Sequence, residues 1–209
     1  VVVMVLGEHG FSSGEARSRT NLDLPGLQQE FLEEIYKVNP NIVLVLNNGR
    51  PLTISWAAEK IPTIVEAWQL GTETGNAVAQ VLYGDYNPSG KLPMSFPRNI
   101  GQVPISYNHY STGRFTNKDN NVFWSHYSDV EKTPLYPFGY GLSYTTFEYS
   151  NLKINKKSFP KGEKIEVSVD LKNTGKVTGK EVAQLYLQDE FASVVRPVKE
   201  LKGFEMIEL

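Results

Sequence analysis

Two glutamates and two arginines lie close together in a glycine-containing stretch near the start of the chain: Glu8, Glu15, Arg17 and Arg19. A carboxylic acid on a loop can donate and accept protons in catalysis when burial and neighbouring charges adjust its pKa. The alternative is a solvated ion pair between Glu15 and Arg19, which would stabilise the loop by about 0–1 kcal/mol. Residue types alone favour the ion pair, because charged loop side chains are mostly exposed.

The elements around this stretch predict a site at one edge of a parallel sheet. The apolar run Val1–Leu6 is typical of a strand buried on both faces, and a polar loop follows it from Gly7 to about Leu24. Further strands are predicted at Ile42–Leu46 and Thr63–Trp68. Ligands of open α/β sheets bind at the carboxyl ends of the strands, so the loop after the first strand is where we expect the chemistry.

Helices are predicted between and after these strands. Pro25 fits the first turn of one helix, and Asn39-Pro40 ends it. Its predicted apolar stripe consists of Leu27, Phe31, Leu32, Ile35 and Tyr36. A second helix is predicted after Gly75, with one face formed by Ala77, Val78, Val81 and Leu82. This alternation predicts an α/β fold with an open, mainly parallel sheet flanked by helices, an α/β sandwich.

The second half of the sequence has a different character. From Tyr86 to about Tyr144, proline, glycine, asparagine and aromatic residues predict an irregular segment packed by its rings. Beyond Phe147, alternating patterns predict half-buried antiparallel strands at Asn151–Ile154, Lys164–Leu171 and Glu181–Leu187. Only about four strands fit, whereas an immunoglobulin or fibronectin III-like β-sandwich has about seven, so we expect a partial sandwich. The predicted domains are residues 1–147 and 148–209.

Composition excludes several classes of function. The chain has 21 Lys and Arg against 23 Asp and Glu, which argues against a nucleic-acid or membrane-surface partner. It has no cysteine, and His9, His109 and His126 share no ligand-like spacing, so neither a metal nor a cofactor is predicted. No phosphate-binding glycine motif supports nucleotide binding. Val1–Leu6 is too short to span a bilayer and is not a signal peptide, and this apolar start suggests a fragment.

Several ordered motifs together carry a family resemblance. Gly7-Glu8 ends the first strand, Glu15 is followed four residues later by Arg19, and Leu24-Pro25-Gly26 then leads into a helix. Further motifs follow in order: Asn48-Gly49-Arg50-Pro51, Glu66-Ala67-Trp68, Gly71–Asn76, Leu82–Pro97, Tyr136–Thr145, Asn173-Thr174-Gly175, Arg196-Pro197 and Lys202-Gly203-Phe204. Over nearly its whole length the chain resembles glycoside hydrolase family 3, and most closely its periplasmic β-glucosidases. The resemblance implies a C-terminal α/β sandwich domain followed by a truncated fibronectin type III-like domain.

The resemblance also implies a mechanism and partners. Members of this family hydrolyse terminal β-D-glucosidic bonds with retention, using a nucleophilic aspartate of an N-terminal (β/α)8 barrel to which no residue here corresponds. Glu15 matches the general acid/base of many members, and Glu8 is the competing candidate. Retaining chemistry places the two carboxyl groups about 5–5.5 Å apart, so the loop would reach over the mouth of the barrel. The implied partners are that barrel and a β-glucoside or oligosaccharide substrate, and the implied location is the periplasm or the cell exterior.

Four further residues are candidates for substrate binding: Arg19, Tyr110, Arg114 and Trp124. A cation beside Glu15 would lower the pKa of its carboxyl group, which opposes acid function unless desolvation compensates. A bracing role in the loop is therefore favoured for Arg19, because planar arginine groups often hold loop backbone. Ordinary packing is favoured for Trp68, which lies inside a predicted strand.

Two alternatives to a β-glucosidase stay open. Sugar specificity depends chiefly on the barrel, so another activity of the family, such as β-xylosidase, is possible. A non-catalytic carbohydrate-binding or adhesive module is the second, although the sandwich segment shows no aromatic row suited to sugar stacking. We expect the 209-residue chain by itself to be inactive, because one carboxylate cannot perform a double displacement. The sequence does not predict an oligomeric state.

Overall fold

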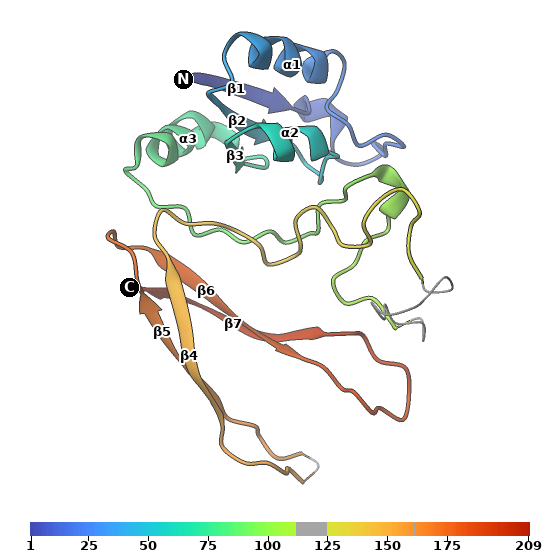
Figure 1. Cartoon of the computed structure of the whole chain (residues 1–209), viewed down its shortest axis with the longest axis vertical. Coiled ribbons are helices and arrows are strands. Elements are labelled where there is room, and N and C mark those ends of the chain that lie inside the picture. Colours follow the sequence, from blue (N-terminus) through green and yellow to red (C-terminus); the bar gives the residue numbers. More distant parts are fainter. Residues whose placement is uncertain (112–124, 161) are drawn as a thin grey trace.

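The computed structural model describes residues 1–111, 125–160 and 162–209. It has a sheet with helices at one end, antiparallel strands at the other, and an irregular segment between them (Figure 1). This arrangement confirms the predicted fold class, a parallel sheet with helices followed by antiparallel strands. The division of the chain into residues 1–147 and 148–209 stays a prediction.

The parallel sheet has the order β1-β2-β3. Strand β1 spans Val2–Gly7, β2 spans Ile42–Asn47 and β3 spans Thr63–Glu66. Mainly apolar residues form these strands, and β2 lies in the middle with Leu44 and Leu46 fully buried. The burial predicted for both faces of β1 is wrong, because Val3 and Val5 are exposed. The third strand is shorter than predicted, because the backbone of Trp68 adopts a φ of 51°. The Trp68 ring packs on the core instead, with its centroid 5.8 Å from that of Phe96.

Helices α1 (Gln28–Val38), α2 (Ser55–Lys60) and α3 (Thr74–Tyr83) connect and follow the strands. Short 3₁₀ helices occur at Gly10–Ser12, Gly71–Glu73 and Ile100–Gln102. The stripe predicted for α1 is correct at Leu32, which is fully buried, and at Ile35 and Tyr36, which pack against the core. It is wrong at Leu27 and Phe31, whose exposed fractions are 71% and 54%.

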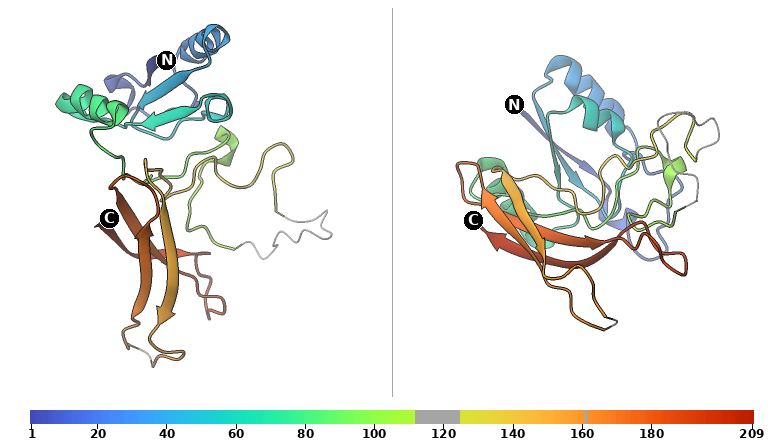
Figure 2. Two further views of the ribbon diagram at one scale, coloured as in Figure 1. Left: turned by 60° about the vertical axis from the view of Figure 1, so that its left-hand side comes forward. Right: turned by 60° about the horizontal axis from the view of Figure 1, so that its bottom comes forward.

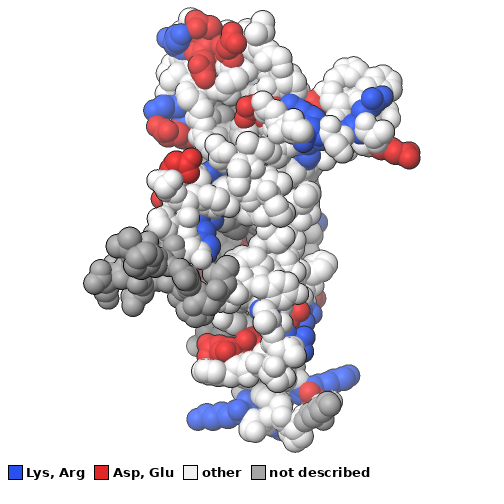
Figure 3. Space-filling model, turned by 90° about the vertical axis from the view of Figure 1, so that its right-hand side faces the viewer, with Lys and Arg blue, Asp and Glu red and all other residues white. Residues whose placement is uncertain are grey.

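The C-terminal strands pair in two antiparallel ladders, visible apart from the parallel sheet in both views of Figure 2. Strands β4 (Phe147–Ile154) and β5 (Val167–Asn173) form one ladder. Strands β6 (Lys180–Leu187) and β7 (Glu200–Glu208) form the other. Basic and acidic side chains occur in small groups of both signs on the face in Figure 3, in keeping with a net charge of −2.

The irregular segment joins the two ends of the molecule. Its two halves pair by backbone hydrogen bonds, including Phe96 N to Tyr136 O at 2.8 Å. Lys91 Nζ donates to the carbonyl of Gly141 at 2.9 Å and forms an ion pair with Glu181 of β6 at 3.0 Å. Tyr149 of β4 donates to the other oxygen of Glu181. We call the contacts of Lys91, Glu181 and Tyr149 the junction.

Candidate active site

The carboxyl ends of the parallel strands carry three polar side chains in a row. Glu8 follows β1, Asn48 follows β2, and Glu66 is the last residue of β3. The strands approach closely here, because a Cβ atom at Gly7 would lie 2.1 Å from the carbonyl oxygen of Asn47. Gly7 has a φ of 134°, which glycine adopts without strain. A strand end that only glycine fits therefore delivers Glu8 to the sheet edge.

The side chain of Glu8 is fully buried and both of its oxygens are occupied. Arg19 Nη1 lies 2.8 Å from Oε1, and Arg50 Nε lies 3.1 Å from Oε1 and 3.2 Å from Oε2. The backbone N–H of Gly49 donates to Oε2 at 3.3 Å. Glu8 thus holds together two arginines and the start of the segment after β2, residues 48–51, which we call the β2 loop.

The same arginines donate to the backbone of the loop. Arg50 Nη2 lies 2.7 Å from the carbonyl oxygen of Ser12 and 2.8 Å from that of Arg17. Arg19 Nη2 donates to the carbonyl of Asp23 at 3.0 Å. We call residues 8–26 the loop, and its central stretch, residues 12–17, the Glu15 turn. Ser13 of the loop also lies close against Gly49, just beyond the end of β2, since a Cβ atom at Gly49 would lie 1.9 Å from Ser13 Oγ.

Glu15 lies at the tip of this turn and is exposed. Arg17 N donates to Gly14 O at 3.2 Å, and Ala16 has a φ of 59°, an uncommon conformation for a residue with a side chain. Within the described ranges, no hydrogen bond or ion pair engages the Glu15 carboxyl group. The alternative ion pair between Glu15 and Arg19 is therefore wrong, because Arg19 is turned inward to Glu8.

Sequence reasoning assigned no role to Glu66 and Asn48. The Glu66 carboxyl accepts hydrogen bonds from Trp68 N at 3.0 Å and from Asn48 Nδ2 at 3.4 Å. Burial raises the pKa of Glu66 to about 7. Asn48 is fully buried, and its Nδ2 also donates to the carbonyl of Arg50 at 2.8 Å. A glutamate ending an otherwise apolar strand is the sequence signal that could have marked this position.

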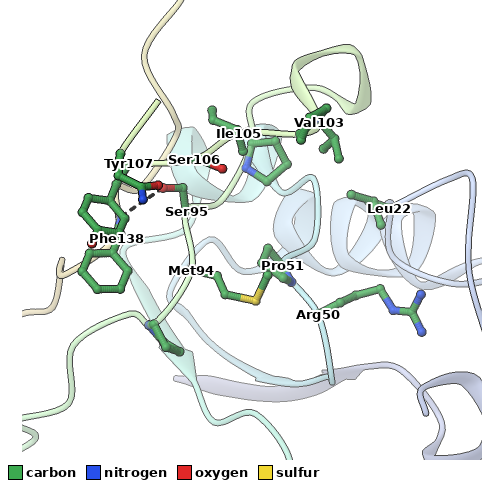
Figure 4. Close-up of a pocket in the computed structure, with 14 residues that line it drawn as sticks. Leu22, Arg50, Pro51, Met94, Ser95, Val103, Ile105, Ser106, Tyr107 and Phe138 are labelled. Atoms are coloured by element: carbon green, nitrogen blue, oxygen red, sulfur yellow. Dashed lines mark hydrogen bonds between the residues drawn. The ribbon is translucent and has the colours of Figure 1, made fainter. Parts of the chain in front are cut away.

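Two hollows flank the loop. A mainly apolar pocket of about 500 Å³ lies between the irregular segment and the β2 loop. Figure 4 shows the stacked rings of Tyr107 and Phe138 at one end and Leu22 at the other, with Arg50 extending away from the rings. A second hollow of about 410 Å³ is lined by loop residues only: Ser12, Ala16, Arg17, Ser18, Arg19, Pro25 and Gly26. The Glu15 turn thus borders a concave surface.

The remaining predicted residues do not gather at this edge in the described structure. Tyr110 is 60% exposed and pairs through its backbone with Pro197. Arg114 and Trp124 lie outside the described residues. In the parts of the chain that are described, no three His, Cys, Asp or Glu residues are grouped as metal ligands would be, and no helix combines the length and apolarity needed to cross a membrane.

Comparison with known proteins identifies the family. Residues 1–144 match the glycosyl hydrolase family 3 C-terminal domain, and residues 181–209 match a fibronectin type III-like domain. The chain is 50% identical over its whole length to a periplasmic β-glucosidase of Salmonella typhimurium, and 48% identical to a β-xylosidase of Formosa agariphila. A β-glucosidase of Listeria innocua solved in complex with isofagomine superposes over the whole chain with a TM-score of 0.94 and 44% identity. The chain spans 28% of the length of these two relatives and 29% of the Listeria chain.

Proposed function

Because this chain belongs to glycoside hydrolase family 3, we propose that it supplies the general acid/base of a retaining β-glucosidase, and that Glu15 is that residue. The nucleophilic aspartate would lie in a (β/α)8 barrel domain encoded outside these residues. The small share of the relatives' length that the chain spans supports this division of labour.

One observation carries the choice of Glu15. Of the two glutamates in the loop, Glu8 has both oxygens bound by Arg19, Arg50 and the Gly49 N–H, whereas the Glu15 carboxyl is exposed. An acid/base must come within hydrogen-bonding distance of the leaving oxygen, and a carboxyl group fixed by arginines cannot move there. The carboxyl group of Glu15 is not bound by an arginine in this way and is open to a substrate.

The proposed steps follow from retaining chemistry. Protonated Glu15 donates its proton to the glycosidic oxygen as the bond to the anomeric carbon breaks and the barrel aspartate bonds to that carbon. The resulting Glu15 carboxylate then takes a proton from water, whose oxygen displaces the aspartate and releases the sugar. Glu15 returns to its protonated form.

The test is Glu15→Ala in the enzyme that contains both this chain and the barrel. We expect kcat/KM to fall about 10²–10⁴-fold on aryl β-glucosides with poor leaving groups, and far less on activated ones that need no protonation. Azide should accelerate breakdown of the glycosyl-enzyme, because a small anion fills the space and needs no base. Glu30→Ala, an exposed glutamate of α1, is the matched control. An equal loss on every leaving group, without azide rescue, would refute the assignment.

A second candidate activity is β-xylosidase, favoured by the Formosa agariphila relative that is 48% identical over the whole chain. The two sugars differ by one hydroxymethyl group, so the ratio of kcat/KM for matched aryl glucosides and xylosides separates them. We propose glucose as the preferred sugar. A ratio favouring xylose would reassign the specificity without affecting the role of Glu15.

We also propose that the protein acts in the periplasm or outside the cell. The Salmonella typhimurium relative is named as periplasmic. Cell fractionation with a cytoplasmic marker tests this, and recovery with the marker would contradict it.

A further inference from the structure

We propose that Arg50 is the positioning residue for the acid/base: its guanidinium group closes the Glu15 turn and fixes where Glu15 points. This inference rests on the proposed role of Glu15. It concerns a residue that follows β2, far from Glu15 in the sequence.

The geometry of Arg50 links both ends of the turn to one buried anion. A single nitrogen, Nη2, donates to the carbonyl of Ser12, which precedes Glu15, and to that of Arg17, which follows it. The Nε atom of the same guanidinium group contacts both oxygens of Glu8. A planar guanidinium can serve acceptors in several fixed directions, whereas an ammonium group is a compact point charge on a flexible stem.

The turn needs this external support. Its own backbone supplies the bond from Arg17 N to Gly14 O, and Ala16 is held at a positive φ. For a residue with a Cβ atom such a conformation is strained and persists only where surrounding contacts enforce it. The contact of Arg50 with the Arg17 carbonyl lies directly after Ala16 and provides that enforcement.

Arg50 is itself held by the sheet. Its carbonyl accepts a hydrogen bond from Asn48 Nδ2, and Asn48 is fully buried at the end of β2. The preceding Gly49 N–H binds Glu8, and the following Pro51 is buried. The guanidinium group therefore fixes an exposed turn relative to the end of a rigid strand.

The functional consequence is specific to proton transfer. A displacement of the acid by about 1 Å can lower the rate about 10²-fold, because the reacting atoms lose their alignment. Only steps that use the Glu15 proton would suffer. Attack by the barrel nucleophile on an activated substrate needs no such proton and should continue.

The experiment compares Arg50→Lys and Arg50→Gln with the parent enzyme. On aryl glucosides with poor leaving groups we expect kcat/KM to fall about 10–100-fold, and on the most activated one less than about 3-fold. Labelling of the nucleophile by an activated 2-fluoroglucoside should keep its rate. Arg98→Lys is the matched control, because Arg98 also binds a backbone carbonyl (Thr133) and a carboxylate (Glu131), but within a different segment.

Each outcome decides the proposal. A loss that is equal for all leaving groups and for labelling, or no loss in either variant, overturns it. If neither variant folds while Arg98→Lys does, Arg50 is a folding residue, and the positioning role is likewise overturned. If Glu15→Ala shows leaving-group dependence and the Arg50 variants do not, only this inference fails. If Glu15→Ala shows no leaving-group dependence, the proposed function is refuted, and this inference, which rests on it, falls with it.

Discussion

The loop after β1 and the junction use the same contact in different ways. In each, a basic side chain binds a carboxylate and a backbone carbonyl from a distant segment: Arg50 with Glu8 and Ser12, and Lys91 with Glu181 and Gly141. At the junction Tyr149 occupies the other oxygen of Glu181, so the cluster is complete in itself. At the loop, the cluster supports a turn that ends in an exposed carboxyl group, Glu15. The charged cluster at the junction thus joins two parts of the chain, whereas the one at the loop lies beneath a turn with an exposed carboxyl group.

The largest expected effect is on the free energy of unfolding, and it should differ between the two glutamates of the loop. Glu8→Gln leaves Arg19 and Arg50 without their carboxylate in a mostly buried site, and we expect it to lower the free energy of unfolding by about 3–5 kcal/mol. Glu15→Gln, at an exposed position, should change it by less than about 0.5 kcal/mol. Urea denaturation of both variants measures the difference. Similar losses would mean that Glu15 is also a structural residue.

The next effect concerns Glu66. Burial raises the pKa of this residue from 4.5 to about 7. Between these pH values the native state binds a proton that the unfolded state has lost, so stability falls as pH rises from 4.5 to about 7 and then stays level. The shift corresponds to about 3 kcal/mol. Glu66→Gln should therefore be more stable than the wild type at pH above about 7, and should lose that advantage below about 4.5.

Denaturation of both proteins across that pH range provides the measurement. Glu30→Gln, on the exposed side of α1, is the control, and its difference from the wild type should not vary with pH. A Glu66→Gln difference that is equally constant would show that the pKa of Glu66 is the same in the native and unfolded states, which would contradict the effect of burial.

A smaller effect is expected at the junction. Lys91 and Glu181 are only 15% and 13% exposed, so Lys91→Met should lower the free energy of unfolding by about 1–2 kcal/mol, between the values for exposed and buried pairs. A double-mutant cycle with Glu181→Gln isolates the pair. In the complete enzyme this variant should leave the ratio of rates on poor and good leaving groups unchanged. A changed ratio would mean that the junction also positions Glu15.

The smallest effect tests the strain in the Glu15 turn. Ala16→Gly removes the steric penalty of a positive φ, about 1–2 kcal/mol, at an entropic cost of about 0.5–1 kcal/mol. We expect a net stabilisation of about 0.5 kcal/mol by urea denaturation. Ala58→Gly, inside helix α2, is the matched control and should destabilise by about 0.5–1 kcal/mol. Destabilisation by both substitutions would contradict the strain argument.

Most of the fold could be predicted because its strands are locally encoded. Apolar runs located β1 and β2 to within one residue at each end, and alternation located β6 equally well. Helix α2 was not predicted, since its six residues are too few to show a helical period. The exposure of Phe31 also escaped prediction, because an apolar stripe does not reveal how much of it a neighbour covers.

Less of the site could be predicted. Family motifs predict the loop and its candidate Glu15, but the sequence does not predict the partner of Arg19: the alternative ion pair has the nearer Glu15, and the observed partner is Glu8. The contacts of Arg50 are not predictable from sequence either, since its acceptors lie 33 to 42 positions away. Such contacts depend on strand order and on how the strand ends align, which residue spacing does not encode.

The close approach of Ser13 to Gly49 gives protein engineers a position at which to alter the packing of the loop. A Cβ atom added at position 49 would lie 1.9 Å from Ser13 Oγ and 2.7 Å from Ser13 Cβ, so the Ser13 side chain would have to move. We expect alanine and then serine at this position to displace Ser13 by increasing amounts. Rates of glycosidic bond cleavage measured for such variants would show how strongly the reaction depends on the position of this loop.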